Sequence, residues 1–176
     1  ANPDYRTGAE KKRGGYIHIN NNAMEWNFIK GANWRHPRGP DSSLDGLESH
    51  PVVLVNWEDA RAYCKWVSAR LPTEAQWEKA ARGTDGRTYP WGNQPPYHLL
   101  CNFNNDQQGT TPVGSYPAGA SPYGVLDMVG NVWEWCTDWY KENYYRVSLL
   151  KNPQGPTSGR LRIVRGGSWL DKEKCL

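Results

Sequence analysis

Two stretches of the chain carry apolar residues at helical spacing, and the first of them lies between residues 56 and 70. Apolar side chains recur there every three or four positions, so they share one face of a helix: Ala60, Tyr63, Cys64 and Val67. Asn56 precedes this pattern and is suited to an N-cap, and Pro72 follows it and would break a helix. We therefore predict a helix after Asn56 with one apolar face packed inward.

The second helical stretch begins at Thr73. The sequence Thr-Glu-Ala-Gln at positions 73–76 is that of a capping box, in which the first and fourth side chains satisfy each other's backbone N–H groups. Gly83 is suited to the helix end. We predict a helix between these positions, with Trp77, Ala80 and Ala81 facing inward.

The patterns typical of strands are short. The aliphatic run at residues 52–55 predicts a buried strand, and residues 160–164 predict a strand that enters a turn at Gly166 and Gly167. Residues 1–50 show turn chemistry without regular elements, and residues 84–146 show no strong helical pattern. Two helices followed by short irregular strands predict a loop-rich α+β fold. Without an internal repeat or a second composition class, residues 1–176 are predicted to form a single domain.

The amino-acid composition argues against several classes of function. Ten Trp and ten Tyr against two Phe, with 18 Gly and 13 Pro, indicate shaped loops around a core of amphipathic rings. The mean hydropathy of −0.84 and the short aliphatic runs predict no membrane-spanning segment. The net charge is only +3, and no basic stripe alternates with aromatic residues, so nucleic-acid binding is not expected. The cysteines lack CxxC spacing, which argues against a zinc knuckle.

Several sequence blocks, in this order, resemble the formylglycine-generating enzyme family, also called sulfatase-modifying factors: GANWRHPRGPDSSL (31–44), HPVVLVNWEDARAYCKW (50–66), RLPTEAQWEKAARG (70–83), YPWGN (89–93), CNFN (101–104), TPVGSYP (111–117), YGVLDMVGNVWEW (123–135) and VRGGSW (164–169). The resemblance implies a C-type lectin-like fold of the formylglycine-generating enzyme type. That fold supports catalysis, calcium binding and protein display, so the fold alone does not fix the function.

The resemblance also implies structural calcium. Calcium takes about six to eight oxygen ligands, often carboxylates with backbone carbonyls between them. The family's first site maps onto the carboxylates of Asp127 and Glu134 and the carbonyls of Gly130 and Val132. A second site maps onto a separate loop, where its ligands would be Asn102, the Phe103 carbonyl and either Asn105 or Asp106.

The catalytic chemistry of the family does not map cleanly. Its enzyme uses copper held by two cysteine thiolates to oxidise a sulfatase cysteine to formylglycine, with molecular oxygen as oxidant. Asp171 stands at the position of the first cysteine, and Cys175 falls one residue short of the second. Because Cu(I) prefers soft thiolates to carboxylates, bound copper is not expected and we predict no oxidase activity.

The resemblance also implies a remnant of the family's active-site pocket. Ser168 matches a serine that lines the family's active site, Trp133 matches its pocket tryptophan, and Trp169 replaces a tyrosine. Asp171 and Cys175 complete the set. The order Trp-Leu-Asp after Gly-Gly-Ser is similar to that of the vertebrate non-catalytic paralogue.

Two further blocks of the family, an opening strand block and a final Arg-rich strand, are not found in this sequence. Cys64 matches a family cysteine that pairs with one in that final block, so we expect it to be a free, buried thiol. Apolar surface left open by the two blocks would need a cover, which favours a longer protein or other protein chains as partners.

The leading hypothesis is therefore a non-catalytic, calcium-stabilised binding or structural subunit, and two alternatives stay open. One is an active copper-dependent oxidase whose cysteines lie outside this chain. The other is a ligand-displaying protein with the C-type lectin fold, for which peptides or sugars are the candidate ligands. The family slightly favours an extracytoplasmic compartment.

Overall fold

The computed structural model describes residues 4–18 and 25–176. The chain forms two compact units, Ala1–Arg70 and Leu71–Leu176. The single domain expected from the sequence stays a prediction. Among the described residues, no helix is long and apolar enough to cross a bilayer.

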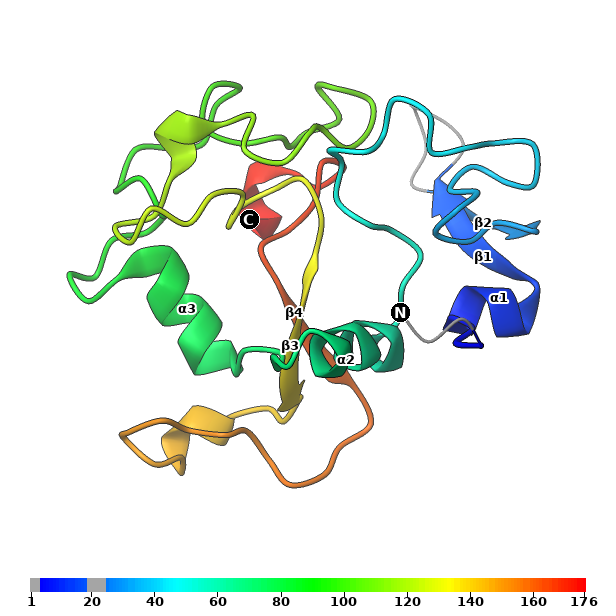
Figure 1. Ribbon diagram of the computed structural model, residues 1–176. Helices are drawn as coiled ribbons and strands as arrows, with labels where there is room; N and C mark the ends of the chain where they lie inside the picture. Colours follow the sequence, from blue (N-terminus) through cyan, green and yellow to red (C-terminus); the bar gives the residue numbers. More distant parts are fainter. Residues whose placement is uncertain (1–3, 19–24) are drawn as a thin grey trace. The chain divides into compact units, whose positions relative to one another are not determined.

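The first unit opens with the helix α1 (Gly8–Lys12) and an antiparallel hairpin of β1 (Gly14–His18) and β2 (Trp26–Lys30), shown in Figure 1. Arg13 has a φ of 58°, so it ends α1 and turns the chain into β1. The prediction that residues 1–50 lack regular elements is wrong here, and positions 1–3 and 19–24 of that range lie outside the described residues. Elements of five residues are too short to show a periodicity.

The helix α2 (Trp57–Trp66) begins where the sequence predicts. The Asp59 N–H donates to Asn56 Oδ1 at 2.9 Å, and the Asn56 N–H donates to Asp59 Oδ2 at 3.0 Å, which completes a capping box. The predicted inward apolar face is wrong, because Tyr63 is 61% and Val67 43% exposed.

The side chain of Asp59 instead fixes α2 within the first unit. This buried carboxylate accepts hydrogen bonds from Tyr5 Oη at 2.8 Å and from the Gly8 N–H at 3.0 Å. Burial and the neighbouring carboxylate raise the pKa of Tyr5 to about 12. Hydrogen bonds to Asp59 at the helix N-terminus therefore hold α2, in place of the predicted inward apolar face.

The strand predicted at residues 52–55 does not form. Leu54 has a φ of 58°, in the left-handed region, which interrupts an extended strand. Val52 is 58% exposed rather than buried. The aliphatic run is therefore an irregular approach to α2.

In the second unit, the helix α3 (Glu74–Arg82) has the predicted capping box between Thr73 and Gln76. Its buried side chains Trp77 and Ala81 join Met128 and Cys136 in a small core. Ala80 packs against this core and is partly buried, so the inward face predicted for α3 is confirmed.

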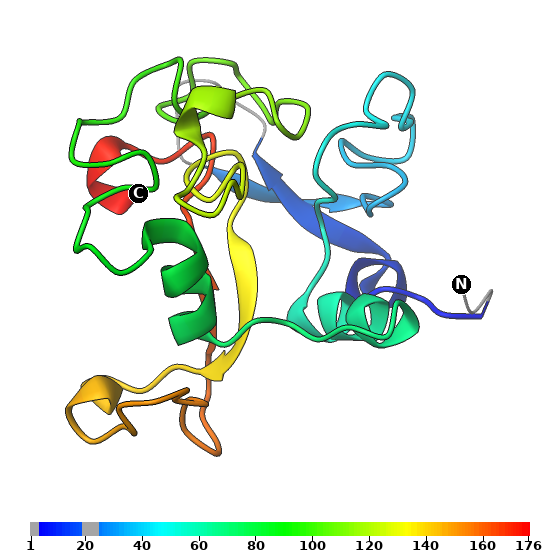
Figure 2. The ribbon, with the colours of Figure 1, turned by 60° about the vertical axis from the view of Figure 1, so that its left-hand side comes forward.

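Beside α3 lie two antiparallel strands, β3 (Glu134–Trp139) and β4 (Arg162–Arg165), as Figure 2 shows. The predicted strand at residues 160–164 is confirmed with a shift of its bounds. The register pairs Glu134 with Arg165 and Trp139 with Arg162, and a bulge lies between these pairs. Short 3-10 turns complete the unit: Pro117–Gly119, Tyr144–Arg146 and Glu173–Cys175.

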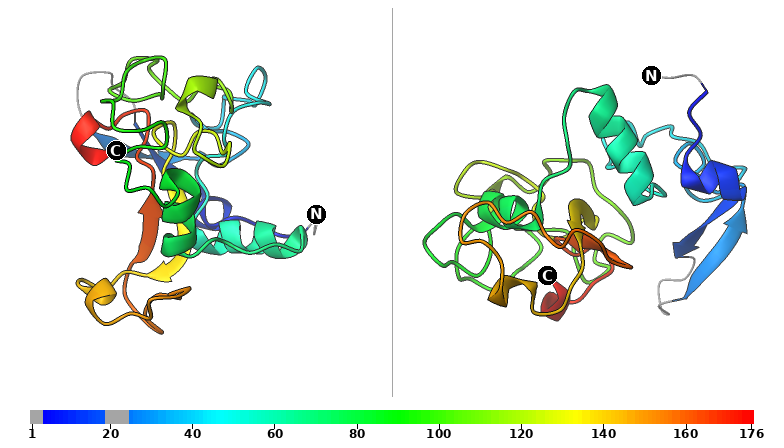
Figure 3. Two further views of the ribbon diagram at one scale, coloured as in Figure 1. Left: turned by 90° about the vertical axis from the view of Figure 1, so that its left-hand side faces the viewer. Right: turned by 90° about the horizontal axis from the view of Figure 1, so that it is seen from below.

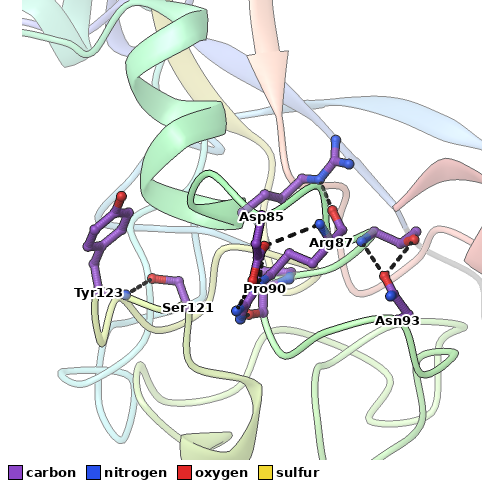
Figure 4. A network of polar contacts seen from close by, with 8 residues as sticks. Asp85, Arg87, Pro90, Asn93, Ser121 and Tyr123 are labelled. Carbon is purple, nitrogen blue, oxygen red and sulfur yellow. Dashed lines mark hydrogen bonds and ion pairs between the residues drawn. The ribbon is translucent and has the colours of Figure 1, made fainter.

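Polar contacts shape the loop that follows α3 (Figure 4). Arg87 donates to Asp85 and to the Pro90 carbonyl, the latter at 3.0 Å, and Asn93 Oδ1 accepts from the Thr88 N–H at 2.9 Å. Arg87 lowers the pKa of Asp85 to about 2. These side-chain contacts, together with an antiparallel backbone bridge between Tyr89 and Gly92, support this irregular segment.

Candidate functional site

Three segments that are distant in the sequence meet at Gly130. The Gly130 N–H donates to the Gly166 carbonyl, and the Asn131 N–H donates to the Asn102 carbonyl, both at 2.8 Å. Gly130 has a φ of 79°, and a Cβ there would lie 2.2 Å from the Asn102 carbonyl oxygen. Only glycine allows this approach, which joins the two predicted calcium loops to the Gly-Gly-Ser turn.

Asn131 holds the crossing together. It is buried, its Oδ1 accepts from the Thr111 N–H at 2.9 Å, and its Nδ2 donates to the Thr111 carbonyl at 3.1 Å. Its own carbonyl accepts from the Trp169 N–H at 3.0 Å. Gly-Asn is a turn signal in the sequence, but no sequence pattern indicates that the Asn131 side chain bonds to Thr111.

The first predicted calcium loop places Glu134 at the start of β3, against the core. Glu134 Oε2 accepts from Trp77 Nε1 at 2.6 Å. Burial raises the pKa of Glu134, the bond from Trp77 partly opposes this, and the negative charge of Asp127 adds to the rise. The carboxylates of Asp127 and Glu134 therefore repel each other in a poorly solvated region, a pairing that a divalent cation would relieve.

Asp127 has one oxygen engaged by the protein, since its Oδ2 accepts from the Gly114 N–H at 2.6 Å. Its φ of 56° places it in the left-handed region. Gly130 is buried and Val132 is half-buried on the same loop. Across the described residues, no group of three His, Cys, Asp or Glu side chains could hold a metal. An ion here would need carbonyl and amide oxygens besides the two carboxylates.

The second predicted loop centres on Asn102, which is 1% exposed. Its Nδ2 donates to the Gly109 carbonyl at 2.9 Å, while its Oδ1 is buried and has no hydrogen-bond partner within residues 4–18 and 25–176. A buried acceptor without a partner lowers the stability of the fold by about 1–3 kcal/mol. Coordination of a metal ion by this oxygen would remove that cost.

The other predicted ligands of that loop are arranged differently. The Phe103 carbonyl accepts from the Asp106 N–H at 3.2 Å. Asp106 is exposed, and its Oδ1 accepts from Asn104 Nδ2 at 3.2 Å. Asn105 is half-buried, and its N–H donates to the Trp169 carbonyl at 2.7 Å. The alternative between Asn105 and Asp106 stays a prediction.

At the remnant pocket, Asp171 closes the Gly-Gly-Ser turn. Its Oδ2 accepts from both the N–H and the Oγ of Ser168, at 2.9 Å and 2.6 Å, and its own N–H donates to the Ser168 carbonyl at 3.1 Å. Trp133 is 43% exposed and Trp169 is half-buried. The structure therefore brings Ser168 and Asp171 together, with Asp171 as a hydrogen-bond acceptor, a role that the sequence analysis missed.

The cysteines do not form a thiolate pair. Among the described residues none of the four forms a disulfide; Cys175 is exposed, and Cys64 is half-buried rather than buried. Leu176, at the position after Cys175, lies close to Gly167, where an added Cβ would approach Leu176 Cδ2 to 2.7 Å. Burial raises the pKa of the Cys101 and Cys136 thiols to about 12, which keeps them protonated near neutral pH.

The chain is similar in sequence to known proteins over most of its length. The family described as "Sulfatase-modifying factor enzyme 1-like domain" matches residues 6–176. The chain is 45% identical over 159 residues to the formylglycine-generating enzyme of Mus musculus, covering 82% of this chain and 42% of the relative. It is 40% identical over 157 residues to the "Inactive C-alpha-formylglycine-generating enzyme 2" of Bos taurus, covering 83% of this chain and 47% of the relative. The chain thus spans about half the length of such relatives or less.

Solved structures show the same fold. One is PvdO from Pseudomonas aeruginosa, with a TM-score of 0.61 and 26% identity, over 71% of this chain and 52% of that one. Another is variable protein 1 of Treponema denticola, with a TM-score of 0.65 and 25% identity, over 82% of this chain and 69% of that one. The predicted fold, α+β and C-type lectin-like, is confirmed.

Proposed function

Because this chain belongs to the sulfatase-modifying factor enzyme 1-like family, we propose that it is a non-catalytic member that serves as a calcium-stabilised binding or structural module. The carrying observation is the pair of hydrogen bonds from Ser168 to Asp171. Asp171, which stands in place of the family's first thiolate, stabilises the turn, and its carboxylate accepts the hydrogen bond of the Ser168 hydroxyl.

The residues present do not fit copper. A Cu(I) site of the family's kind needs two neighbouring thiolates, and this turn offers a carboxylate at Asp171 and one exposed thiol at Cys175. The position after Cys175 carries Leu176, whose side chain lies against Gly167. The similarity to an inactive relative supports the same proposal.

The residues present do fit calcium, although the donor set is completed by the backbone. At the first site, Asp127 and Glu134 supply two carboxylates; at the second, Asn102 supplies a buried oxygen that accepts no hydrogen bond from the described residues. When bound, calcium would neutralise the two carboxylates and hold long loops in place. Gly130 and Val132 would contribute carbonyl oxygens.

A peptide assay tests the non-catalytic role. The chain is loaded with Cu(I), incubated in air with a peptide containing Cys-x-Pro-x-Arg, and analysed by mass spectrometry for the aldehyde. A formylglycine-generating enzyme, such as that of Streptomyces coelicolor, is the positive control. We expect no aldehyde from this chain. Its formation would overturn the proposal.

An active oxidase is the second candidate, and the 45% identity to the mouse enzyme favours it. In this case the missing thiolates would come from residues outside this chain or from a partner. The same assay on the natural full-length protein separates the candidates. Aldehyde formation by that protein, but not by this chain alone, would support the oxidase.

The binding role needs a partner, and other protein chains are the partners we propose, with peptides or sugars as further ligands. The exposed side chain of Trp133 offers a contact surface for them. Isolation of the protein from its natural source, followed by mass spectrometry of the purified assembly, tests this. A homogeneous monomer would contradict the subunit role.

A further inference from the structure

The segment that joins β3 to β4, residues 140–161, carries large apolar side chains that no described residue covers. Val147 is 78%, Leu149 74% and Leu150 103% exposed. Within the second unit, this segment extends from the end of the strand pair that is distant from the Glu173–Cys175 turn, as Figures 1 and 3 show. Clustered apolar exposure of this kind usually marks an interaction surface.

The base of this segment is anchored. The Tyr140 N–H donates to the Leu161 carbonyl at 2.7 Å, and Tyr145 Oη donates to Glu74 Oε2 at 2.9 Å. The Arg162 guanidinium lies 3.4 Å from the centre of the Trp139 ring. The exposed residues Val147, Leu149 and Leu150 therefore belong to a segment whose two ends are held by hydrogen bonds and a cation–π contact.

The same segment carries two exposed tyrosines, Tyr140 and Tyr145, which are 54% and 52% exposed. Tyrosine has an apolar ring and a polar hydroxyl, so it is favoured where an apolar phase meets water. The segment therefore combines exposed aliphatic and exposed aromatic side chains.

The same segment carries a net positive charge. The segment carries four exposed basic residues and one acidic residue, Glu142: the basic ones are Lys141, Arg146, Lys151 and Arg160. In the described part of the chain, none of these four forms an ion pair. The surface therefore complements one that is both anionic and apolar.

We propose that residues 140–161 bind the surface of an anionic lipid bilayer. Val147, Leu149 and Leu150 would enter the boundary between headgroups and acyl chains, and the basic residues would lie at the lipid phosphates. A bilayer is favoured over a protein partner because exposed leucines on a segment of net positive charge can enter an anionic lipid surface without a shaped counterpart.

Flotation with vesicles tests the proposal. The chain is mixed with vesicles of phosphatidylcholine alone or with about one third phosphatidylglycerol, and the bound fraction is measured. We expect binding only to the anionic vesicles, weakened by 0.5 M NaCl through screening. Replacing both leucines (L149S/L150S) should weaken binding about tenfold or more, because both side chains leave the interface.

Matched variants control for general effects. Leu99 is 58% exposed in the same unit, so L99S should bind like the wild type. K151E should weaken binding, whereas K172E, at another exposed lysine, should have a smaller effect. Circular dichroism checks that each variant is folded.

Three results would overturn the proposal. These are no binding to anionic vesicles, equal binding by the wild type and L149S/L150S, or equal loss in L99S. Size-exclusion chromatography with light scattering covers the alternative occupant: self-association that L149S/L150S abolishes, without vesicle binding, would assign the surface to a second copy of this chain.

Discussion

Replacing Asp171 by alanine should destabilise the second unit, because the Gly-Gly-Ser turn loses its side-chain acceptor. Asp171 Oδ2 accepts two hydrogen bonds from Ser168, at 2.9 Å from N and 2.6 Å from Oγ. A hydrogen bond to a charged group contributes about 1.5–3 kcal/mol. Asp171 is only half-buried, so solvent lowers the contribution of each bond to about 1 kcal/mol, and the two together contribute about 2 kcal/mol. In a protein of this size, that corresponds to a fall in Tm of about 4–8 °C.

Graded variants separate the two bonds. S168A removes only the hydroxyl donor, and D171N keeps one oxygen acceptor, so each should cost about 1 kcal/mol. The double variant S168A/D171A should cost less than the sum of the single variants, by about 1 kcal/mol, because both remove the same contact. Thermal unfolding followed by circular dichroism measures all four proteins.

The reasoning fails if D171A melts within about 1 °C of the wild type, or if S168A and D171A are fully additive. Either result would mean that the carboxylate does not hold the turn. The structural role assigned to the residue at the position of the missing thiolate would then have no support.

Further predictions concern packing, thiols and calcium. Gly8→Ala should cost about 1–2 kcal/mol, measured by urea unfolding, because the new Cβ would lie 2.1 Å from the capping amide of α2; an unchanged unfolding midpoint would contradict this. Iodoacetamide at pH 8 should modify Cys175, which is exposed, and spare Cys101 and Cys136, whose buried thiols have a pKa of about 12; peptide mass spectrometry shows which react. Calcium at about 100 times its Kd should add about 2.7 kcal/mol of stability, seen as a rise in Tm that EDTA reverses. Glu134→Gln should remove most of that rise, and an equal rise in the variant would rule out this carboxylate as a ligand.

The helices could be predicted because their signals are local. Asn56 is the N-cap that its position suggests, Thr73 forms the predicted capping box, and Trp77 is buried as its spacing indicates. The prediction of a strand at residues 52–55 was wrong, because hydrophobicity does not reveal the left-handed φ of Leu54. The hairpin of β1 and β2 was missed because strands of five residues carry little periodicity.

The candidate site could be located from the sequence only by resemblance, and its contacts could not. The bond from Trp77 to Glu134 joins residues 57 positions apart. The crossing at Gly130 depends on the Asn102 carbonyl, a backbone atom that no sequence pattern marks. Ser168 and Asp171 are three residues apart, yet their hydrogen bonds require the turn to be formed first.

The most direct test of the central claim is a Cu(I) titration of the reduced chain against a chromophoric chelator, with C175S as the control. With a carboxylate at Asp171 and one exposed thiol, we predict no high-affinity site and no difference between the wild type and C175S. One tightly bound Cu(I) per chain, lost in C175S, would contradict the account.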